Sequence, residues 1–139
     1  MLGSVELKDY MIKNPVTARP ELTVYEAALR ILDHKVSGLV VVDERKALMG
    51  MLSELDCLRV ILAGVYNDEE FGAALVGDVM AREVEFQHPH DDIVDVATSM
   101  LDHKHRRRPV VEDGLLVGQV TCRQILKVVT EGLVDQKRR

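Results

Sequence analysis

The sequence contains two copies of one unit, and this duplication limits the possible folds more than any other feature. Shifting the chain by 69 positions aligns Leu7–Glu44 with Val76–Asp113, and both copies then contain Asp-His-Lys, at Asp33–Lys35 and Asp102–Lys104. A single long period of this kind indicates a duplicated structural unit. Since a unit of about 60 residues buries only about 60% of its unfolded surface, we expect the two copies to share one core.

Hydrophobic periodicity within each copy alternates between helical and extended patterns. Apolar residues at i, i+3, i+4 and i+7 over Val24–Leu32 predict an amphipathic helix, and Thr23 with Glu26 forms a capping box at its start. The second copy keeps this stripe over Ile93–Leu101, with Asp92 as the N-cap. The other predicted elements are extended segments near 16–17 and 84–86, strands at 39–42, 48–52, 109–111 and 115–120, and helices at 54–62 and 122–130. The pattern therefore predicts an α/β fold of two β-α-β-β-α repeats.

The repeat also predicts the organisation of the chain. We place the first repeat at residues 1–66, a linker at 67–75, the second repeat at 76–131 and a C-terminal tail at 132–139. The linker is placed there because the stretch Ala63–Leu75 contains a polar run and two glycines: Asn67, Asp68, Glu69 and Glu70, with Gly64 and Gly72.

Composition excludes several classes of protein. The chain has 139 residues, of which 47% are hydrophobic, so a folded core is available. A net charge of −5 argues against a general binder of nucleic acid or of anionic membranes. The apolar runs are shorter than a membrane helix, no secretory signal is visible, and Cys57 and Cys122 belong to no metal-binding or disulfide motif. These features predict a cytoplasmic protein without a metal site.

Two strings at corresponding places carry a family resemblance. They are SGLVVVDERKALMGMLSELD (Ser37–Asp56) and RRPVVEDGLLVGQVTCRQ (Arg107–Gln124), and together they resemble a tandem pair of CBS domains, a Bateman module. The resemblance covers the chain from about Val5 to Val129. It implies two repeats packed as a pseudo-two-fold pair, with adenine nucleotides or related ligands bound in the clefts between the repeats. It also implies a regulatory role and a homodimer.

The resemblance assigns a ligand site to the turn after the second strand of the first copy. Gly50–Asp56 matches the family pattern of glycine, two apolar residues, Ser or Thr, two spacers and Asp. It implies that Ser53 binds a phosphate at the helix N-terminus and that Asp56 accepts hydrogen bonds from a ribose diol. The other residues that it implies are Met51, Val16 and Val36 around the base, with Ser37 and Gly38 at the start of the preceding strand. Ser-x-x-Asp is also a helix-capping signature that needs no ligand.

The second copy departs from this pattern. Thr121 keeps the hydroxyl, but Gln124 stands where the family has Asp. Thr-x-x-Gln predicts that capping is preserved in full while the ribose-binding carboxylate is lost. We therefore expect the two sites to be unequal.

A run of basic residues precedes the turn of the second copy. The resemblance places His105, like Val36 of the first copy, at the border of the partner repeat's cleft. It places Arg106 and Arg107 where they can face a phosphate, which a guanidinium binds through a planar fork. The run has two other interpretations. It is a solvated charge run that pairs with acidic residues such as Glu112 and Asp113, or it is a nucleic-acid patch, which the net charge argues against.

The leading hypothesis is a regulatory module that binds AMP, ADP, ATP or S-adenosylmethionine, needs no covalent cofactor and signals to an unidentified partner protein. The alternative is an interaction module with vestigial clefts, in which apolar helix faces drive assembly. An enzyme has the least support, because no nucleophile–base pair can be assembled and no catalytic residue is assigned. Apolar residues beyond what a small sheet covers, among them Leu58 and Leu126 of the two later helices, predict a homodimer.

Overall fold

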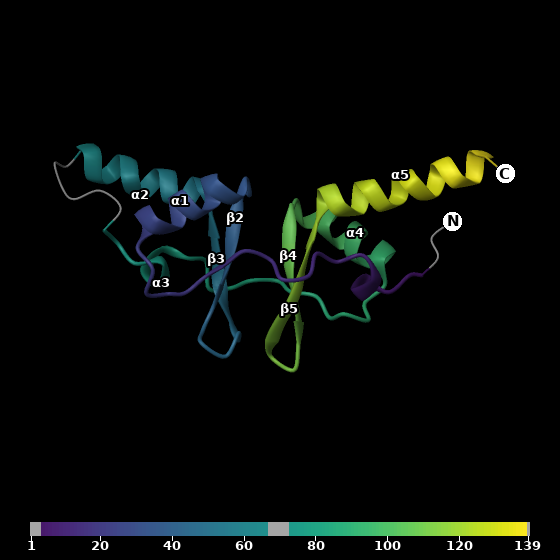
Figure 1. The fold of residues 1–139 in the computed structure, drawn as a ribbon, viewed down its shortest axis with the longest axis horizontal. Coiled ribbons are helices and arrows are strands. Elements are labelled where there is room, and N and C mark those ends of the chain that lie inside the picture. Colours follow the sequence, from purple (N-terminus) through teal and green to yellow (C-terminus); the bar gives the residue numbers. More distant parts are fainter. Residues whose placement is uncertain (1–3, 67–72, 139) are drawn as a thin grey trace. The chain divides into compact units, whose positions relative to one another are not determined.

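The computed structural model describes residues 4–66 and 73–138 and divides the chain into two compact units (Figure 1). The N-unit comprises Pro15–Val84, and the C-unit comprises Met1–Asn14 together with Glu85–Arg139. Each unit contains one copy of the helix-strand-strand-helix order that the repeat predicts. Residues 67–72 of the predicted linker lie outside the described residues.

The compact units cross the boundaries of the sequence repeats. In the C-unit, Ile12 and Gln119 exchange two backbone hydrogen bonds of 2.8 and 2.9 Å. In the N-unit, Ala81 and Met51 stand at the corresponding positions and exchange bonds of 2.9 and 3.0 Å. The segment that leads each repeat in the sequence therefore pairs with the strands of the other repeat.

Two glycines at corresponding positions permit this pairing. A Cβ atom on Gly50 would lie 2.4 Å from the carbonyl oxygen of Ala81, and one on Gly118 would lie 2.9 Å from that of Ile12. Any side chain at either position would push the paired segment away from the strand. The glycine shared by the two copies is thus explained by the close approach of a neighbouring backbone.

The N-unit builds a three-stranded sheet with helices packed on it. Its elements are β1 (Thr17–Ala18), α1 (Val24–His34), β2 (Gly38–Val42), β3 (Leu48–Ser53), α2 (Glu54–Tyr66) and α3 (Val76–Val79). The strand order is β1-β2-β3, with β1 parallel and β3 antiparallel to β2. The core of the N-unit comprises Ala18, Val24, Ala27, Ile31, Leu39, Val41, Leu52, Cys57, Val76 and Met80.

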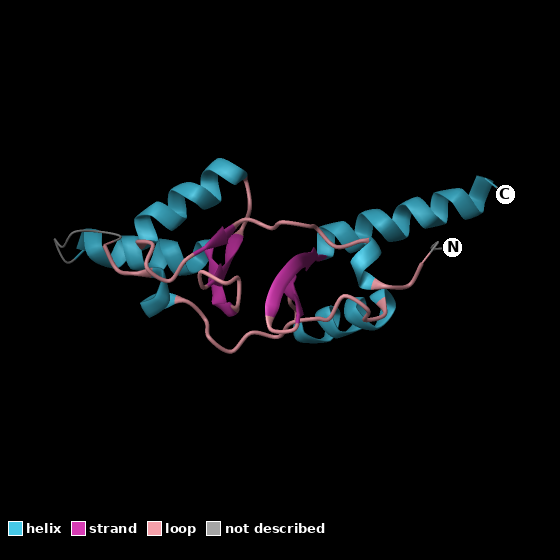
Figure 2. Ribbon diagram, turned by 60° about the horizontal axis from the view of Figure 1, so that its bottom comes forward, coloured by secondary structure: helices cyan, strands magenta, loops and turns pink. Residues whose placement is uncertain are grey.

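The C-unit repeats this plan with a shorter sheet. Its elements are the 3-10 helix η1 (Leu7–Asp9), α4 (Ile93–His103), β4 (Arg107–Glu112), β5 (Leu115–Thr121) and α5 (Cys122–Arg138). Within residues 4–66 and 73–138 no third strand joins the antiparallel pair β4-β5, although Gln87 makes a parallel bridge to Val110 where β1 lies in the N-unit. Its core comprises Leu7, Ile93, Val96, Met100, Val110, Val120, Ile125 and Val128. In both units a strand leads directly into a helix, β3 into α2 and β5 into α5 (Figure 2).

The predicted caps of the first helices are confirmed. Thr23 Oγ1 accepts a hydrogen bond from Glu26 N at 3.1 Å, and Glu26 Oε1 accepts one from Thr23 N at 3.3 Å, which completes the capping box of α1. Asp92 Oδ1 accepts bonds from the first turn of α4. Both helices end on a left-handed lysine, Lys35 with φ 55° and Lys104 with φ 57°.

Three expectations about the fold need correction. Each unit has its own apolar core rather than one shared core, because the exchanged segments add buried residues such as Leu7 and Val76. The helices α2 and α5 continue beyond their expected ends at residues 62 and 130, to Tyr66 and Arg138, and so pass through Gly64 and Gly132 despite the low helix propensity of glycine. The segment 84–86 forms no strand, and only the bridge of Gln87 replaces it.

Candidate functional site

The turn from β3 to α2 in the N-unit holds the two residues that the sequence pattern singled out. Ser53 Oγ accepts a hydrogen bond from Asp56 N at 3.1 Å, and Asp56 Oδ2 accepts one from Ser53 N at 3.0 Å. This is a reciprocal capping box, so the capping interpretation of Ser-x-x-Asp is confirmed. The other carboxylate oxygen accepts from Arg59 Nη1 at 3.3 Å, in an ion pair whose arginine side chain is 73% exposed. Because two carboxylate oxygens offer about four acceptor sites, Asp56 keeps acceptor capacity beyond the cap.

The start of β2 lies beside this turn. Gly38 is the register partner of Ser53, and Glu54 N donates to the carbonyl oxygen of Ser37 at 2.9 Å. A Cβ atom on Gly38 would lie 2.8 Å from the carbonyl oxygen of Leu52, so a larger residue would disturb the strand pair. The structure therefore brings Ser37 and Gly38 together with Ser53 at one end of the hairpin.

The three apolar candidates of the N-unit occupy two different settings. Val16 and Val36 are half-buried and pack against the core of the N-unit. Met51 is also half-buried, but it alternates along β3 with the core residue Leu52 and so points to the opposite face of the sheet. The N-unit thus places apolar side chains on both faces of the sheet next to the Ser53 turn.

The surroundings of the turn shift the pKa of the neighbouring Cys57 thiol. Burial, with a smaller contribution from the Asp56 carboxylate, raises the pKa of the Cys57 thiol. Cys57 is a core residue, 3% exposed. Within residues 4–66 and 73–138, no cluster of three or more His, Cys, Asp or Glu side chains could hold a metal ion.

The corresponding turn of the C-unit is only half capped. Gln124 N donates to Thr121 Oγ1 at 3.1 Å, but the part of the chain that the structure describes shows no return bond from the Gln124 side chain to Thr121 N. The expectation that Thr-x-x-Gln keeps the cap in full was wrong. The longer glutamine side chain places its oxygen one bond farther from the backbone than the aspartate of the N-unit does.

The basic run lies beside the turn of the C-unit. Arg107 is the register partner of Thr121, and Cys122 N donates to the carbonyl oxygen of Arg106 at 2.9 Å. Arg106 is exposed, whereas Arg107 and His105 are half-buried. The neighbourhood of Thr121 with the two arginines therefore follows from strand register.

Two further basic residues near Thr121 were missed from the sequence. Arg123 and Lys127 line a surface depression together with Thr121 and Gln124. Their spacing of i and i+4 on α5, one turn apart on the same helix face, is the signal that could have found them. The start of α5 is thus more basic than the motif alone indicates.

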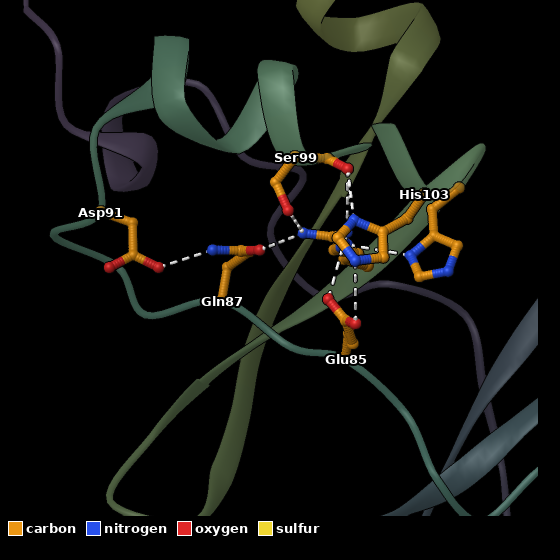
Figure 3. Close-up of polar contacts among 7 residues, drawn as sticks. Glu85, Gln87, Asp91, Ser99 and His103 are labelled. Atoms are coloured by element: carbon orange, nitrogen blue, oxygen red, sulfur yellow. Dashed lines mark hydrogen bonds and ion pairs between the residues drawn. The ribbon is translucent and has the colours of Figure 1, made fainter. Parts of the chain in front are cut away.

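Arg108, the third arginine of the run, has a different role. Its side chain is 2% exposed and forms an ion pair of 3.2 Å with Glu85 (Figure 3). The interpretation of the run as a solvated charge run that pairs with residues such as Glu112 and Asp113 is therefore wrong for this residue. Arg108 occupies the position of Leu39 in the first copy, and this inward-facing position was the available signal.

None of the helices in residues 4–66 and 73–138 is long and apolar enough to cross a membrane.

Comparison with known proteins identifies the family. The CBS domain family matches the chain twice, over residues 7–63 and 76–131. Inosine-5'-monophosphate dehydrogenase of Staphylococcus aureus is 35% identical over 122 residues, which are 86% of this chain and 23% of the enzyme. The chain spans less than half the length of the curated relatives that it matches.

Solved structures support the same assignment. The structure of CBSX2 in complex with AMP, a protein of Arabidopsis thaliana, has a TM-score of 0.81 and 27% identity and covers 92% of this chain and 98% of that one. The CBS domain pair of protein MJ0100, in complex with 5'-methylthioadenosine and S-adenosyl-L-methionine, has a TM-score of 0.75 and 26% identity, with 91% and 97% covered. The chain therefore belongs to the CBS domain family and has the α/β fold of a tandem CBS pair.

Proposed function

We propose that the N-unit binds an adenosine-type nucleotide, AMP, ADP, ATP or S-adenosylmethionine, through the turn between β3 and α2. The observation that carries this proposal is the pairing of Ser53 and Asp56 on a strand-to-helix turn, next to the small residues Ser37 and Gly38. The complexes of CBSX2 with AMP and of the MJ0100 pair with 5'-methylthioadenosine and S-adenosyl-L-methionine support an adenosine-type ligand.

Each part of the nucleotide has a suitable group at this turn. The N-terminus of α2 offers backbone N–H groups and the positive end of the helix dipole, and the Ser53 hydroxyl adds a donor for a phosphate oxygen. The remaining acceptor capacity of Asp56 suits the two hydroxyls of a ribose. Apolar surface for a base is present on both faces of the sheet, from Val16 and Val36 on the core side and from Met51 on the opposite face.

We further propose that this binding is regulatory rather than catalytic, and that the chain acts as a homodimer which passes a signal to a partner protein. Apolar side chains on the later helices remain exposed: Leu55 (66%), Leu58 (53%) and Leu62 (45%) on α2, and Leu126 (64%) and Val129 (41%) on α5. On each helix these residues are three or four positions apart and so share a face, and exposed apolar faces of this kind mark interfaces. A light-scattering mass near twice 15.6 kDa at micromolar concentration supports the dimer, and a mass of 15.6 kDa contradicts it.

An interaction module without a ligand is the second candidate. The observation that favours it is that Ser53 and Asp56 already satisfy one another as a cap. In that case the turn stabilises α2, and the exposed apolar helix faces carry the function.

Calorimetric titration separates the two candidates. AMP, ADP, ATP, S-adenosylmethionine and NAD are each titrated into the protein at one ionic strength, with Asp56→Asn as the control because the amide oxygen can still cap α2. Heat with at least one adenosine-type ligand, reduced in the variant, supports nucleotide binding. No heat with any of the ligands refutes it and favours the interaction module.

A further inference from the structure

Four corresponding positions differ in polarity between the two units. In the N-unit they are apolar and belong to the core or pack against it: Val16, Ala18, Val36 and Leu39. In the C-unit they are polar: Glu85, Gln87, His105 and Arg108. The backbone supports the correspondence, because Ala18 pairs in parallel with Val41 and Gln87 pairs in parallel with Val110, which is the equivalent of Val41.

The guanidinium of Arg108 has a partner for each of its five N–H groups (Figure 3). Nε donates to His105 Nδ1 at 3.1 Å, and Nη1 donates to Gln87 Oε1 at 2.7 Å and to Ser99 Oγ at 2.9 Å. Nη2 donates to the carbonyl oxygen of Ser99 at 3.3 Å and lies 3.2 Å from Glu85 Oε2. Arg108 is thus saturated and has no N–H group left for a ligand.

The partners of Arg108 are themselves held in place. Gln87 Nε2 donates to Asp91 Oδ2 at 2.7 Å, and Glu85 Oε1 lies 3.6 Å from Nε2 of His103 (Figure 3). Glu85 nevertheless remains half exposed, at 52%. Arg108 therefore joins Glu85, Gln87 and His105 in one connected polar network, which we call the Arg108 network. The Glu85 carboxylate of this network faces solvent at the position where the N-unit has Val16.

The presence of Glu85 and His105 in the C-unit, where the N-unit has Val16 and Val36, changes which ligands the surface can bind. An apolar ring placed against Val16 and Val36 buries hydrocarbon, which is favourable. The same ring placed against Glu85 and His105 would remove a charged carboxylate from water without giving it a new partner, which is costly. The C-unit also lacks the ribose-binding carboxylate, because Gln124 replaces it. Both changes act against a nucleoside at the turn of the C-unit.

We infer that Glu85 and Arg108 are specificity-determining residues that exclude the adenosyl group from the C-unit, so that each chain binds one adenosine-type nucleotide, at the N-unit. The inference rests on the proposed function and deepens it. Arg108 acts by holding Glu85 and His105, and Glu85 acts directly at the surface. The turn of the C-unit keeps its basic residues, so an affinity for free phosphate groups is compatible with this assignment.

The number of AMP molecules bound per chain tests the inference. Equilibrium dialysis with AMP, carried to saturation, should count one AMP per wild-type chain, and half-saturation of Asp56→Asn should need about tenfold more AMP or higher. The informative variant grafts the residues of the first copy onto the second: Glu85→Val, Gln87→Ala, His105→Val and Arg108→Leu, combined with Gln124→Asp. This graft should bind two AMP per chain, whereas Gln124→Asp alone should still bind one.

The outcomes separate this inference from the proposed function. Two equivalent AMP per wild-type chain would overturn the inference and leave the proposed function standing. A folded graft that still binds one AMP would also overturn it. No AMP on the wild-type chain would overturn both. If the graft does not fold, the dialysis curves of the wild type and Asp56→Asn still test the inference, because an unchanged AMP affinity in Asp56→Asn contradicts the assignment of the single AMP to the N-unit.

Discussion

Substitutions at Asp56 can separate its role in folding from its role in binding. Asp56→Ala removes the acceptor of the 3.0 Å bond from Ser53 N, and loss of such a cap costs about 1 kcal/mol of the free energy of unfolding. The pair with Arg59 adds little to this figure, because the arginine side chain is 73% exposed and exposed pairs contribute roughly 0–1 kcal/mol. Asp56→Asn keeps an oxygen that can accept from Ser53 N, so we expect stability within about 0.5 kcal/mol of wild type.

Ligand affinity should respond differently from stability. Both substitutions remove a charged acceptor from the ribose, and hydrogen bonds to charged groups contribute about 1.5–3 kcal/mol. The affinity for AMP should therefore fall about tenfold or more in both variants. Urea unfolding measures the stability and calorimetry the affinity. Gln124→Ala is the matched control in the C-unit and should leave the AMP affinity unchanged.

The combination of results decides the interpretation. The ligand role predicts that Asp56→Asn loses affinity while its unfolding curve stays near that of wild type. If Asp56→Asn binds AMP as tightly as the wild type, Asp56 is a helix cap only and the reasoning about ribose is wrong.

Three further predictions concern other parts of the chain. Replacing Arg106 and Arg107 with Ala should weaken the binding of inorganic polyphosphate more than that of AMP, with a difference that shrinks as salt is added, since guanidinium groups recognise phosphate charge; equal losses, or none, would refute a phosphate-binding role of these two arginines. A thiol reagent should label the exposed Cys122 promptly and the buried Cys57 only as the N-unit opens, because burial also raises the pKa of Cys57; rapid labelling of both thiols contradicts the burial of Cys57. Backbone hydrogen bonds from Ala47 and Arg45 lower the pKa of Asp43, so its stabilising effect is present above its unfolded pKa and is lost as pH falls through the lower folded value. Unfolding measured at pH 6 and at pH 3 should thus show a smaller acid-induced loss in Asp43→Ala than in wild type, and identical losses would refute this assignment.

Local patterns predicted much of each unit. The stripe over Val24–Leu32 and the box of Thr23 and Glu26 appear in the structure as expected, because a helix and its cap depend on residues only a few positions apart. The same reason explains the success at Ser53 and Asp56. The two hairpins also formed where short strands separated by short turns were predicted.

Features that depend on distant pairing were not predictable in the same way. The pairing of each leading segment with the strands of the other repeat depends on contacts such as that of Ile12 with Gln119. No pattern among neighbouring residues predicts such a contact. The Arg108 network joins residues from Glu85 to Arg108, and the arginine run looked like surface until β4 turned one of its members inward. Gln124 shows that residue type alone does not predict a complete cap. Glutamine can cap a helix, but in the described structure the Gln124 side chain accepts no hydrogen bond from Thr121 N.

The most direct test of nucleotide binding at the N-unit is a crystal structure of the chain grown with saturating AMP. The account predicts one AMP per chain, with its ribose hydroxyls at hydrogen-bond distance, about 3 Å, from the Asp56 carboxylate and its phosphate at Ser53 and the start of α2. AMP bound with its ribose at Gln124 instead, or no AMP at the Ser53 turn under these conditions, would contradict it.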